Sequence, residues 1–273
     1  MILIFSGFNK RYKYINNILL NKFPNSSIII QKDFKGDHKG KYNNDPRYDK
    51  ETIKLFENHI QERDKTEKKY YPDDKFYLNE NTKYLYTTSK ELNSEKTIKF
   101  VKSLKPKMVF VFGVGLLNYQ LLQCFEKISV INLHFGITPK YRGSNTLLWP
   151  LYLNDPGHLG ITLHQIDSKI DHGPIYHQQT TKFSKKDSIH EIFCKTIIQA
   201  INPTVELIEK IINKTIAAPV KISTPGTIYN NEEFTPEHLK SIYKSLKNGL
   251  LIKYLDKKSN FEKPKLISVL KQN

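Results

Sequence analysis

The chain has 273 residues, and its 38% hydrophobic and 12% aromatic content is enough for a folded core, which excludes a wholly disordered protein. Forty-three Lys and Arg against 27 Asp and Glu give a net charge of +16. This excess favours anionic partners such as nucleic acid, nucleotides or an acidic membrane surface. Because the surplus is nearly all lysine, a compositional bias is an equally valid interpretation.

The two cysteines, Cys124 and Cys194, are too few for a disulfide framework or a cysteine-based zinc site, so a reducing compartment is expected. The first residues carry no basic stretch typical of a signal peptide. The longest apolar run, Met108 to Leu117, is about half the length that spans a bilayer. We therefore expect a soluble, cytoplasmic protein with no membrane association.

The chain opens with an apolar strand, an amphipathic helix and a second apolar strand, which is the start of a parallel α/β sheet. Strands are predicted at 2–5, 27–31, 84–87, 108–112, 129–133, 160–166 and 175–180. Helices are predicted at 14–23, 49–69, 92–104, 117–125, 145–153 and 188–212. The last helix begins with a capping box at Ser188 and should kink or break at Pro203.

Two regions depart from this alternation. Residues 32–82 form a charged insertion with twelve basic and twelve acidic residues. Residues 240–273 carry a net charge of +7 and no strong strand pattern. We therefore predict a Rossmann-like, mostly parallel sheet flanked by helices over residues 1–182, with the insertion 32–82, and a small helix-rich C-terminal region over 183–273.

The residues that carry chemistry begin at the end of the 129–133 strand. Asn132 and His134 are two residues apart, so both side chains point to the same face. Ligands of open α/β sheets bind beyond the carboxyl ends of the strands, where a histidine and an amide can share one substrate. A single histidine in this place is more often structural than catalytic.

A second polar segment, 166–175, lies between two predicted strands. Asp171 in this segment can place a carboxylate beside His134, and such a pair fixes the tautomer and supports an imidazolium. Taken alone, an aspartate shortly before Gly173 is equally typical of a turn. The other histidines lack metal-ligand spacing, so no metal site is expected.

Order and spacing make the combination specific. The combination runs in the order Asn132, His134, Pro139, Tyr141–Gly143, Trp149, Gly160–His164 and Asp171–Ile175. It resembles the formyltransferase superfamily, which uses N10-formyltetrahydrofolate and includes the methionyl-tRNA, glycinamide ribonucleotide and amino-sugar N-formyltransferases. The resemblance is dense over 106–180, weak over 1–31 and not evident over 32–82 or most of 181–273.

The resemblance implies functional residues at matching positions. The catalytic Asn, His and Asp of the family fall on Asn132, His134 and Asp171. Main chain of a loop after the central strand helps to bind folate in relatives. That loop is Phe112, Gly113, Val114, Gly115, Leu116 and Leu117. Relatives usually have Pro after the catalytic His, whereas this chain has Phe135, which alters the expected entrance to the site.

Formyl transfer needs a neutral amine to attack a formyl carbon whose oxygen gains negative charge. We expect Asn132 to donate a hydrogen bond to that oxygen and His134 either to take the amine proton or to stabilise the oxyanion. Asp171 would pair with His134 or relay protons through water. A basic loop would hold an anionic acceptor, and its residues are Lys140, Tyr141, Arg142 and Gly143.

The acceptor is chosen by elimination among the known classes. A nucleotide-linked amino sugar fits best, because residues 181–273 show no alternating strands typical of the C-terminal barrel of methionyl-tRNA formyltransferases. Methionyl-tRNA remains an alternative, as do another amine or water. A non-catalytic nucleic-acid-binding protein is a further alternative, since aromatic and basic residues interleave near Tyr243 and Tyr254. The sequence leaves the oligomeric state open.

Overall fold

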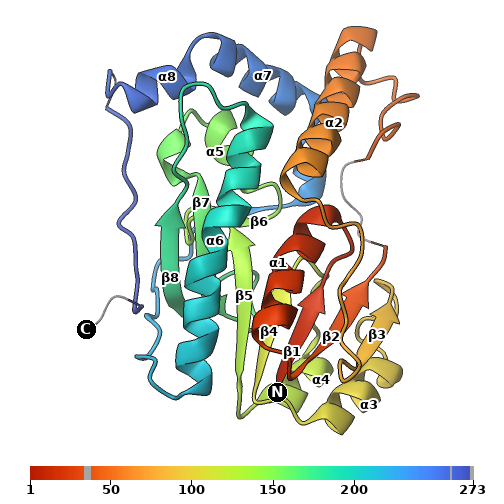
Figure 1. The fold of residues 1–273 in the computed structure, drawn as a ribbon. Helices are drawn as coiled ribbons and strands as arrows, with labels where there is room; N and C mark the ends of the chain where they lie inside the picture. Colours follow the sequence, from red (N-terminus) through yellow and green to blue (C-terminus); the bar gives the residue numbers. More distant parts are fainter. Residues whose placement is uncertain (34–37, 259, 271–273) are drawn as a thin grey trace.

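The computed structural model describes residues 1–33, 38–258 and 260–270, so residues 34–37 of the insertion lie outside the described part. Seven strands form the main sheet: β1 (Ile2–Ser6), β2 (Ser26–Gln31), β3 (Tyr84–Thr87), β4 (Met108–Phe112), β5 (Ser129–Phe135), β7 (Gly160–Gln165) and β8 (Ile175–Thr180). Their order is β3-β2-β1-β4-β5-β7-β8 (Figure 1).

The first five strands of this sheet are parallel, and β7 and β8 are antiparallel to their neighbours. The predicted mostly parallel sheet is therefore confirmed. Every residue of β1, β2 and β4 is buried. Continuous apolar strands of this kind require cover on both faces of the sheet.

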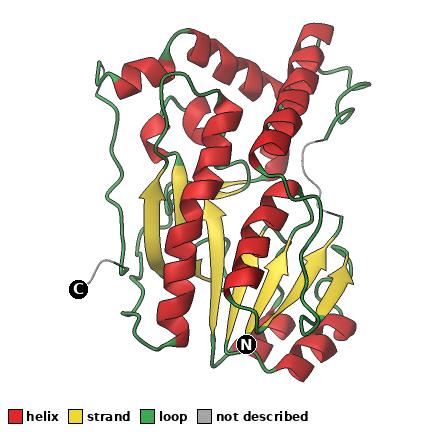
Figure 2. Ribbon diagram, viewed as in Figure 1, coloured by secondary structure: helices red, strands yellow, loops and turns green. Residues whose placement is uncertain are grey.

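Helices supply that cover (Figure 2). They are α1 (Lys10–Lys22), α2 (Lys50–Tyr70), α3 (Glu95–Leu104), α4 (Tyr119–Leu122), α5 (Trp149–Tyr152), α6 (Ile189–Ile212), α7 (Pro236–Lys247) and α8 (Leu250–Leu255). Helices α1 and α6 pack on one face of the sheet, and α3 and α4 pack on the other. Among the described helices, none combines the length and apolarity needed to cross a bilayer.

Helix α6 begins with the predicted capping box and runs unbroken through Pro203, so the expected break is wrong. Because proline has no N–H, the carbonyl of Gln199, four residues earlier, loses its helical donor. Gln179 Nε2 on β8 donates to this carbonyl at 3.4 Å. The helix thus continues because the sheet supplies a replacement for the missing bond.

The predicted helix 145–153 is wrong over its first half, since α5 contains only residues 149–152. Asn145 has a left-handed φ of +57°, which a right-handed helix cannot include, and its carbonyl closes a turn with Leu148 and Trp149. The following elements are short: η1 (Gln123–Phe125), β6 (Arg142–Gly143), η2 (Pro156–His158), β9 (Ile228–Tyr229) and η3 (Asn231–Glu233). Strands β6 and β9 pair in parallel as a separate two-stranded sheet.

The insertion places α2 against α6 and α7 beyond the carboxyl ends of the strands. A second apolar cluster, which includes Phe56 of α2, Ile192 of α6 and Leu239 of α7, holds these helices together. The region after α6 is helix-rich, as predicted, because the lysine-rich part contains α7 and α8.

Residues 260–270, here called the C-terminal segment, run in extended form from α8 back along β8 (Figure 1). Val269 N–H donates to Tyr176 O (2.8 Å), and Gln178 N–H donates to Ile267 O (2.7 Å). These bonds cover part of the edge of β8, which would otherwise present unpaired backbone groups.

Candidate active site

Strands β5 and β7 bring Asn132, His134 and His164 together at the candidate site. In their antiparallel register Asn132 lies opposite His164, and His134 lies opposite Thr162. Asp171 lies in the turn between β7 and β8 with a left-handed φ of +42°, a conformation that aspartate tolerates better than most residues. The three residues predicted to be catalytic therefore meet at one place.

Asp171 is the hydrogen-bonding centre of this group. Its Oδ2 lies 3.2 Å from His134 Nδ1 and accepts a bond from Gly143 N–H at 2.9 Å. Its Oδ1 accepts from Asn132 Nδ2 at 3.0 Å and lies 3.3 Å from His164 Nε2. Burial alone would raise the pKa of Asp171, but His134, His164 and the Gly143 N–H outweigh it and lower the pKa below the usual range. The carboxylate is therefore ionised at neutral pH.

His134 is held at both ring nitrogens. Its Nε2 lies 2.9 Å from the carbonyl oxygen of Tyr141, which only accepts, so this nitrogen donates. Its Nδ1 lies 3.2 Å from the Asp171 carboxylate, which also only accepts, so both contacts are hydrogen bonds when the ring carries both protons. Burial lowers the pKa of His134, while the Asp171 carboxylate opposes that effect. The His134–Asp171 pair can thus take up one proton.

His164 belongs to this group, although it was not predicted as a site residue. Its Nδ1 lies 2.8 Å from the carbonyl of Gln165, and its Nε2 lies 3.2 Å from Asn132 Nδ2. The alternation within β7 could have placed His164 on one face of a strand. The sequence does not give the register with β5, which is what brings it to Asn132.

Gly143 is required at its position for backbone reasons. Its φ is +90°, and a Cβ there would lie 2.3 Å from the carbonyl oxygen of Tyr229. This close approach lets β6 pair with β9 and points the Gly143 N–H at Asp171.

The other residues predicted to bind the substrate are occupied elsewhere. Arg142 is buried, and its guanidinium donates to the carbonyl of Ile170 from Nε at 2.8 Å and to the carbonyl of Pro225 from Nη1. It therefore holds the turn that carries Asp171. Lys140 Nζ binds Asp155 at 2.8 Å and Glu262 at 2.5 Å.

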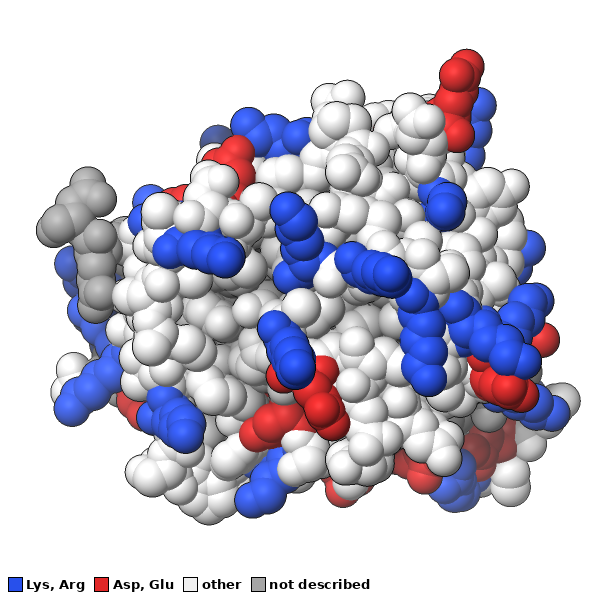
Figure 3. Space-filling model, turned by 90° about the horizontal axis from the view of Figure 1, so that it is seen from below, with Lys and Arg blue, Asp and Glu red and all other residues white. Residues whose placement is uncertain are grey.

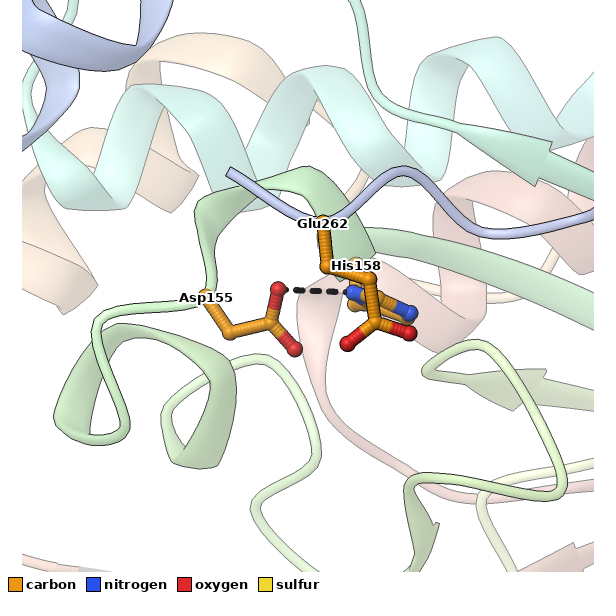
Figure 4. A group of neighbouring side chains, drawn as sticks. All are labelled: Asp155, His158 and Glu262. Carbon is orange, nitrogen blue, oxygen red and sulfur yellow. Dashed lines mark hydrogen bonds and ion pairs between the residues drawn. The ribbon is translucent and has the colours of Figure 1, made fainter. Parts of the chain in front are cut away.

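Tyr141 is also a structural contact, since its hydroxyl donates to Asp155 Oδ2 at 2.7 Å. Asp155 Oδ1 lies 2.8 Å from His158 Nδ1, and Glu262 comes from the C-terminal segment to the same place (Figure 4). Ligand atoms of these three residues lie within 4.8 Å of one another, as in a metal site. The Lys140 ammonium bridges the two carboxylates, so we interpret the group as an ion-pair cluster that ties three segments together.

Asn132, His134 and Asp171, the residues predicted to be catalytic, lie at a cavity of about 950 Å³. Asn132, His134, His164, Asp171 and Gly143 line it, whereas Lys140, Tyr141 and Arg142 do not.

All six residues of the predicted folate loop also line this cavity. Gly113 has a φ of +74°, and a Cβ there would lie 2.1 Å from the ring of Tyr12, so this glycine permits packing on α1. A Cβ at Gly115 would make only ordinary contacts, the nearest at 3.5 Å, and its N–H donates to Gln31 Oε1 at 2.8 Å. Leu116 leaves 71% of its surface exposed.

Curated proteins share the central part of this sequence. The bifunctional polymyxin resistance protein ArnA of Wigglesworthia glossinidia brevipalpis is 34% identical over 124 residues. Methionyl-tRNA formyltransferase of Thermodesulfovibrio yellowstonii is 31% identical over 121 residues, and GDP-perosamine N-formyltransferase of Brucella melitensis is 29% identical over 125. Each match covers 44–45% of this chain but only 19%, 39% and 48% of the respective relatives.

Solved structures share the fold over most of the chain. A 4-N formyltransferase from Francisella tularensis aligns with a TM-score of 0.54 and 14% identity, over 89% of this chain and 85% of the other. An N-formyltransferase from Helicobacter canadensis, in complex with folinic acid and dTDP-3-aminofucose, aligns with a TM-score of 0.51 and 19% identity, over 86% and 73%.

The sequence profile described as Formyl transferase matches residues 19–203, which include the end of α1, Asn132, His134 and Asp171, and most of α6. This match spans more than half of the chain and agrees with the fold and with the resemblance carried by Asn132, His134 and Asp171. The chain belongs to the formyl transferase family.

Proposed function

We propose that this protein transfers a formyl group from N10-formyltetrahydrofolate to the primary amine of a nucleotide-linked amino sugar. The observation that carries the proposal is the Asn132–His134–Asp171 group inside the same cavity as the 112–117 loop. A cavity of about 950 Å³ lies at the upper end of the range for small-molecule sites.

The cavity wall suits a flat heteroaromatic donor. Phe112, Val114, Leu116 and Leu117 supply apolar surface, and the backbone at Gly115 is open to close approach. These residues would hold the folate, which when bound supplies the formyl carbon. The exposed Leu116 side chain would then be covered.

The chain's own residues orient the amine and take its proton. The Asp171 carboxylate fixes the amide of Asn132 with Nδ2 toward it, since two carboxyl or carbonyl oxygens would repel. Since Asn132 Nδ2 also lies 3.2 Å from His164 Nε2, we replace the expected bond from Asn132 to the formyl oxygen: Asn132 Oδ1 is the atom that can accept an N–H of the amine. The His134–Asp171 pair takes up the amine proton, which is the base role among those left open by the sequence, and this proton would then pass to the folate nitrogen that departs.

Similar proteins and the region after α6 both support an amino sugar as the acceptor. GDP-perosamine N-formyltransferase is among the relatives, and the Helicobacter canadensis protein holds a dTDP-linked amino sugar. In the described residues after α6, β9 is the one element assigned as a strand, so this part has no barrel like that expected of a methionyl-tRNA enzyme.

The test is to incubate the protein with N10-formyltetrahydrofolate and a panel of dTDP-, UDP- and GDP-linked amino sugars, with methionyl-tRNA and glycinamide ribonucleotide as competing classes. Chromatography and mass spectrometry would show which acceptor gains a formyl group. Formylation of an amino sugar supports the proposal. Formylation of methionyl-tRNA alone would contradict it.

A further inference from the structure

The inserted helix α2 gives the cavity a cationic end. Three cationic side chains line the cavity among the described residues: Arg11, Arg63 and Lys169. Arg11 lies in the first turn of α1 and Arg63 in α2, next to the β1–α1 connection, whereas Lys169 is exposed in the turn that carries Asp171. Because Lys140 and Arg142 do not line the cavity, the two arginines are the candidates for binding an anionic acceptor.

Each of the two arginines has an acidic partner. Arg11 Nη2 forms an ion pair with Glu67 of α2, and the two side chains are 24% and 12% exposed. Burial opposes the charge of Arg11, but Glu67 raises the pKa of Arg11 above its ordinary value. Arg63, which is 24% exposed, pairs with Asp64, which is 62% exposed and does not line the cavity. An ion pair with so exposed a carboxylate is weak, so a phosphate in the cavity can compete for Arg63.

Arg11 also has one N–H group that donates no hydrogen bond. Its Nε is buried and has no hydrogen-bond partner. A buried donor without a partner is costly, and a bound oxygen anion would remove that cost. Glu67, by holding Nη2, fixes the direction of the guanidinium.

A series of aromatic ring contacts connects the Arg11 end of the cavity with His134. Tyr12, next to Arg11, packs edge-on against Phe112 with ring centroids 4.8 Å apart. Phe112 packs against Phe135 at 5.3 Å, and Phe135 follows the catalytic His134. His134, Arg11 and Arg63 all line the same cavity, so an acceptor could reach His134 with its amine and the arginines with its anionic group.

We propose that Arg11 and Arg63 bind a phosphate group of the acceptor, and that Glu67 positions Arg11 for this contact. The inference rests on the proposed function, because it assigns the second substrate to the same cavity. Guanidinium groups bind phosphate oxygens through paired, charge-assisted hydrogen bonds, for which two arginines on separate helices form a clamp. The role of the insertion is then to bring Arg63 and Glu67 to the acceptor.

The experiment measures binding without turnover. Isothermal titration calorimetry would compare the wild type with Arg63→Gln and Arg11→Gln, using dTDP, UDP, GDP and ribose 5-phosphate as probes and tetrahydrofolate as the donor-site probe. We expect each variant to weaken binding of the preferred phosphate probe by about 10- to 100-fold while tetrahydrofolate binds as in the wild type. Preference for a nucleoside diphosphate over ribose 5-phosphate identifies the source of the phosphate.

Lys65→Gln is the matched control, because it removes one charge from the same helix at a side chain that is 78% exposed. If Arg11→Gln fails to fold because Glu67 is left buried and unpaired, Arg63→Gln still decides the question. Unchanged phosphate binding in Arg63→Gln, or an equal loss in Lys65→Gln, would overturn the inference. Arginine-dependent phosphate binding without any formyl transfer would leave the inference standing and refute the proposed function.

Discussion

Asp171 uses both carboxylate oxygens, each for two partners drawn from different parts of the chain. Asn132 and His134 come from β5, His164 from β7, and the Gly143 N–H from β6. One side chain thus sets the orientation of the whole catalytic group. Its left-handed backbone conformation aims it there and is a local cost that the surrounding bonds offset.

Asp171→Asn should lower kcat by about 10²- to 10⁴-fold, because an amide cannot support the protonated His134 and places an N–H donor against its neighbours. His134→Ala should have a comparable effect. Turnover would be measured by chromatography of the formylated product, and thermal unfolding would establish that each variant is folded. Turnover near that of the wild type in either variant would refute the mechanism.

Asp167→Asn is the matched control for this experiment. Asp167 lies in the same turn and lines the same cavity, but its carboxylate pairs with His172 at 3.1 Å instead of with the catalytic group. We expect kcat to change less than about tenfold. If kcat falls as much as in Asp171→Asn, the effect comes from disturbing the turn and not from loss of the Asp171 carboxylate.

At the scale of elements, α2, α6 and α7 meet through neutral polar side chains. The rings of His59 and His190 have centroids 4.5 Å apart, and the hydroxyl of Tyr243 lies 3.0 Å from His59 Nδ1 and 3.4 Å from His190 Nε2. Burial, and to a lesser degree Arg63, lowers the pKa of His190 to about 4. Burial likewise lowers the pKa of His59.

The stability of this interface should therefore depend on acid pH. An unfolded chain protonates His190 near pH 6.5 and the folded chain near pH 4, so the unfolded state binds more protons in between. The contribution is complete above pH 6.5 and is lost as the pH falls to 4, by up to about 3 kcal/mol. Urea unfolding of the wild type and His190→Phe at pH 7, 5.5 and 4.5 would test this. Equal pH dependence of the two proteins would contradict it.

The ion-pair cluster around Lys140 predicts a stability effect without a catalytic one. Lys140→Met leaves the buried Asp155 carboxylate without its cation and should lower the free energy of unfolding by about 1–3 kcal/mol. Glu262→Gln, at a side chain that is 65% exposed, should cost less than about 1 kcal/mol. Urea unfolding measures both. A raised KM for the acceptor in Lys140→Met, at normal stability, would restore Lys140 to the substrate site.

The sequence predicts elements better than it predicts what their side chains meet. Strands such as β1 and β4 were predictable because buried parallel strands are uninterrupted apolar runs. Asn132, His134 and Asp171 were found because they form an ordered motif. The partners of Lys140 and Arg142 were not, since Glu262, Ile170 and Pro225 reach them only through the folded chain. The site role of His164 was missed for the same reason.

At the scale of the whole molecule, the charge of +16 is dispersed over the one face that Figure 3 draws. Figure 3 shows lysine and arginine side chains spread over the face that it presents, with acidic groups among them. Several lysines form ion pairs, such as Lys185 with Asp256 and Lys195 with Asp187. This distribution favours the compositional interpretation of the charge over a dedicated surface for nucleic acid.

Binding to tRNA should accordingly be weak and non-specific. Fluorescence anisotropy with initiator and elongator tRNA at 50 and 200 mM salt should give similar affinities for the two, with a Kd weaker than about 1 µM at the higher salt. Tight binding that distinguishes initiator tRNA would contradict this and favour methionyl-tRNA as the acceptor.

Pro203 has a consequence for how the molecule assembles. Most of the stability of protein helices comes from packing against the rest of the chain, and in α6 one hydrogen bond of the Gln199 carbonyl depends directly on Gln179 of β8. The proline exchanges a contact between residues four apart for one between residues 20 apart. One hydrogen bond of α6 thereby depends on the main sheet. We expect β8 and α6 to become ordered as one cooperative unit.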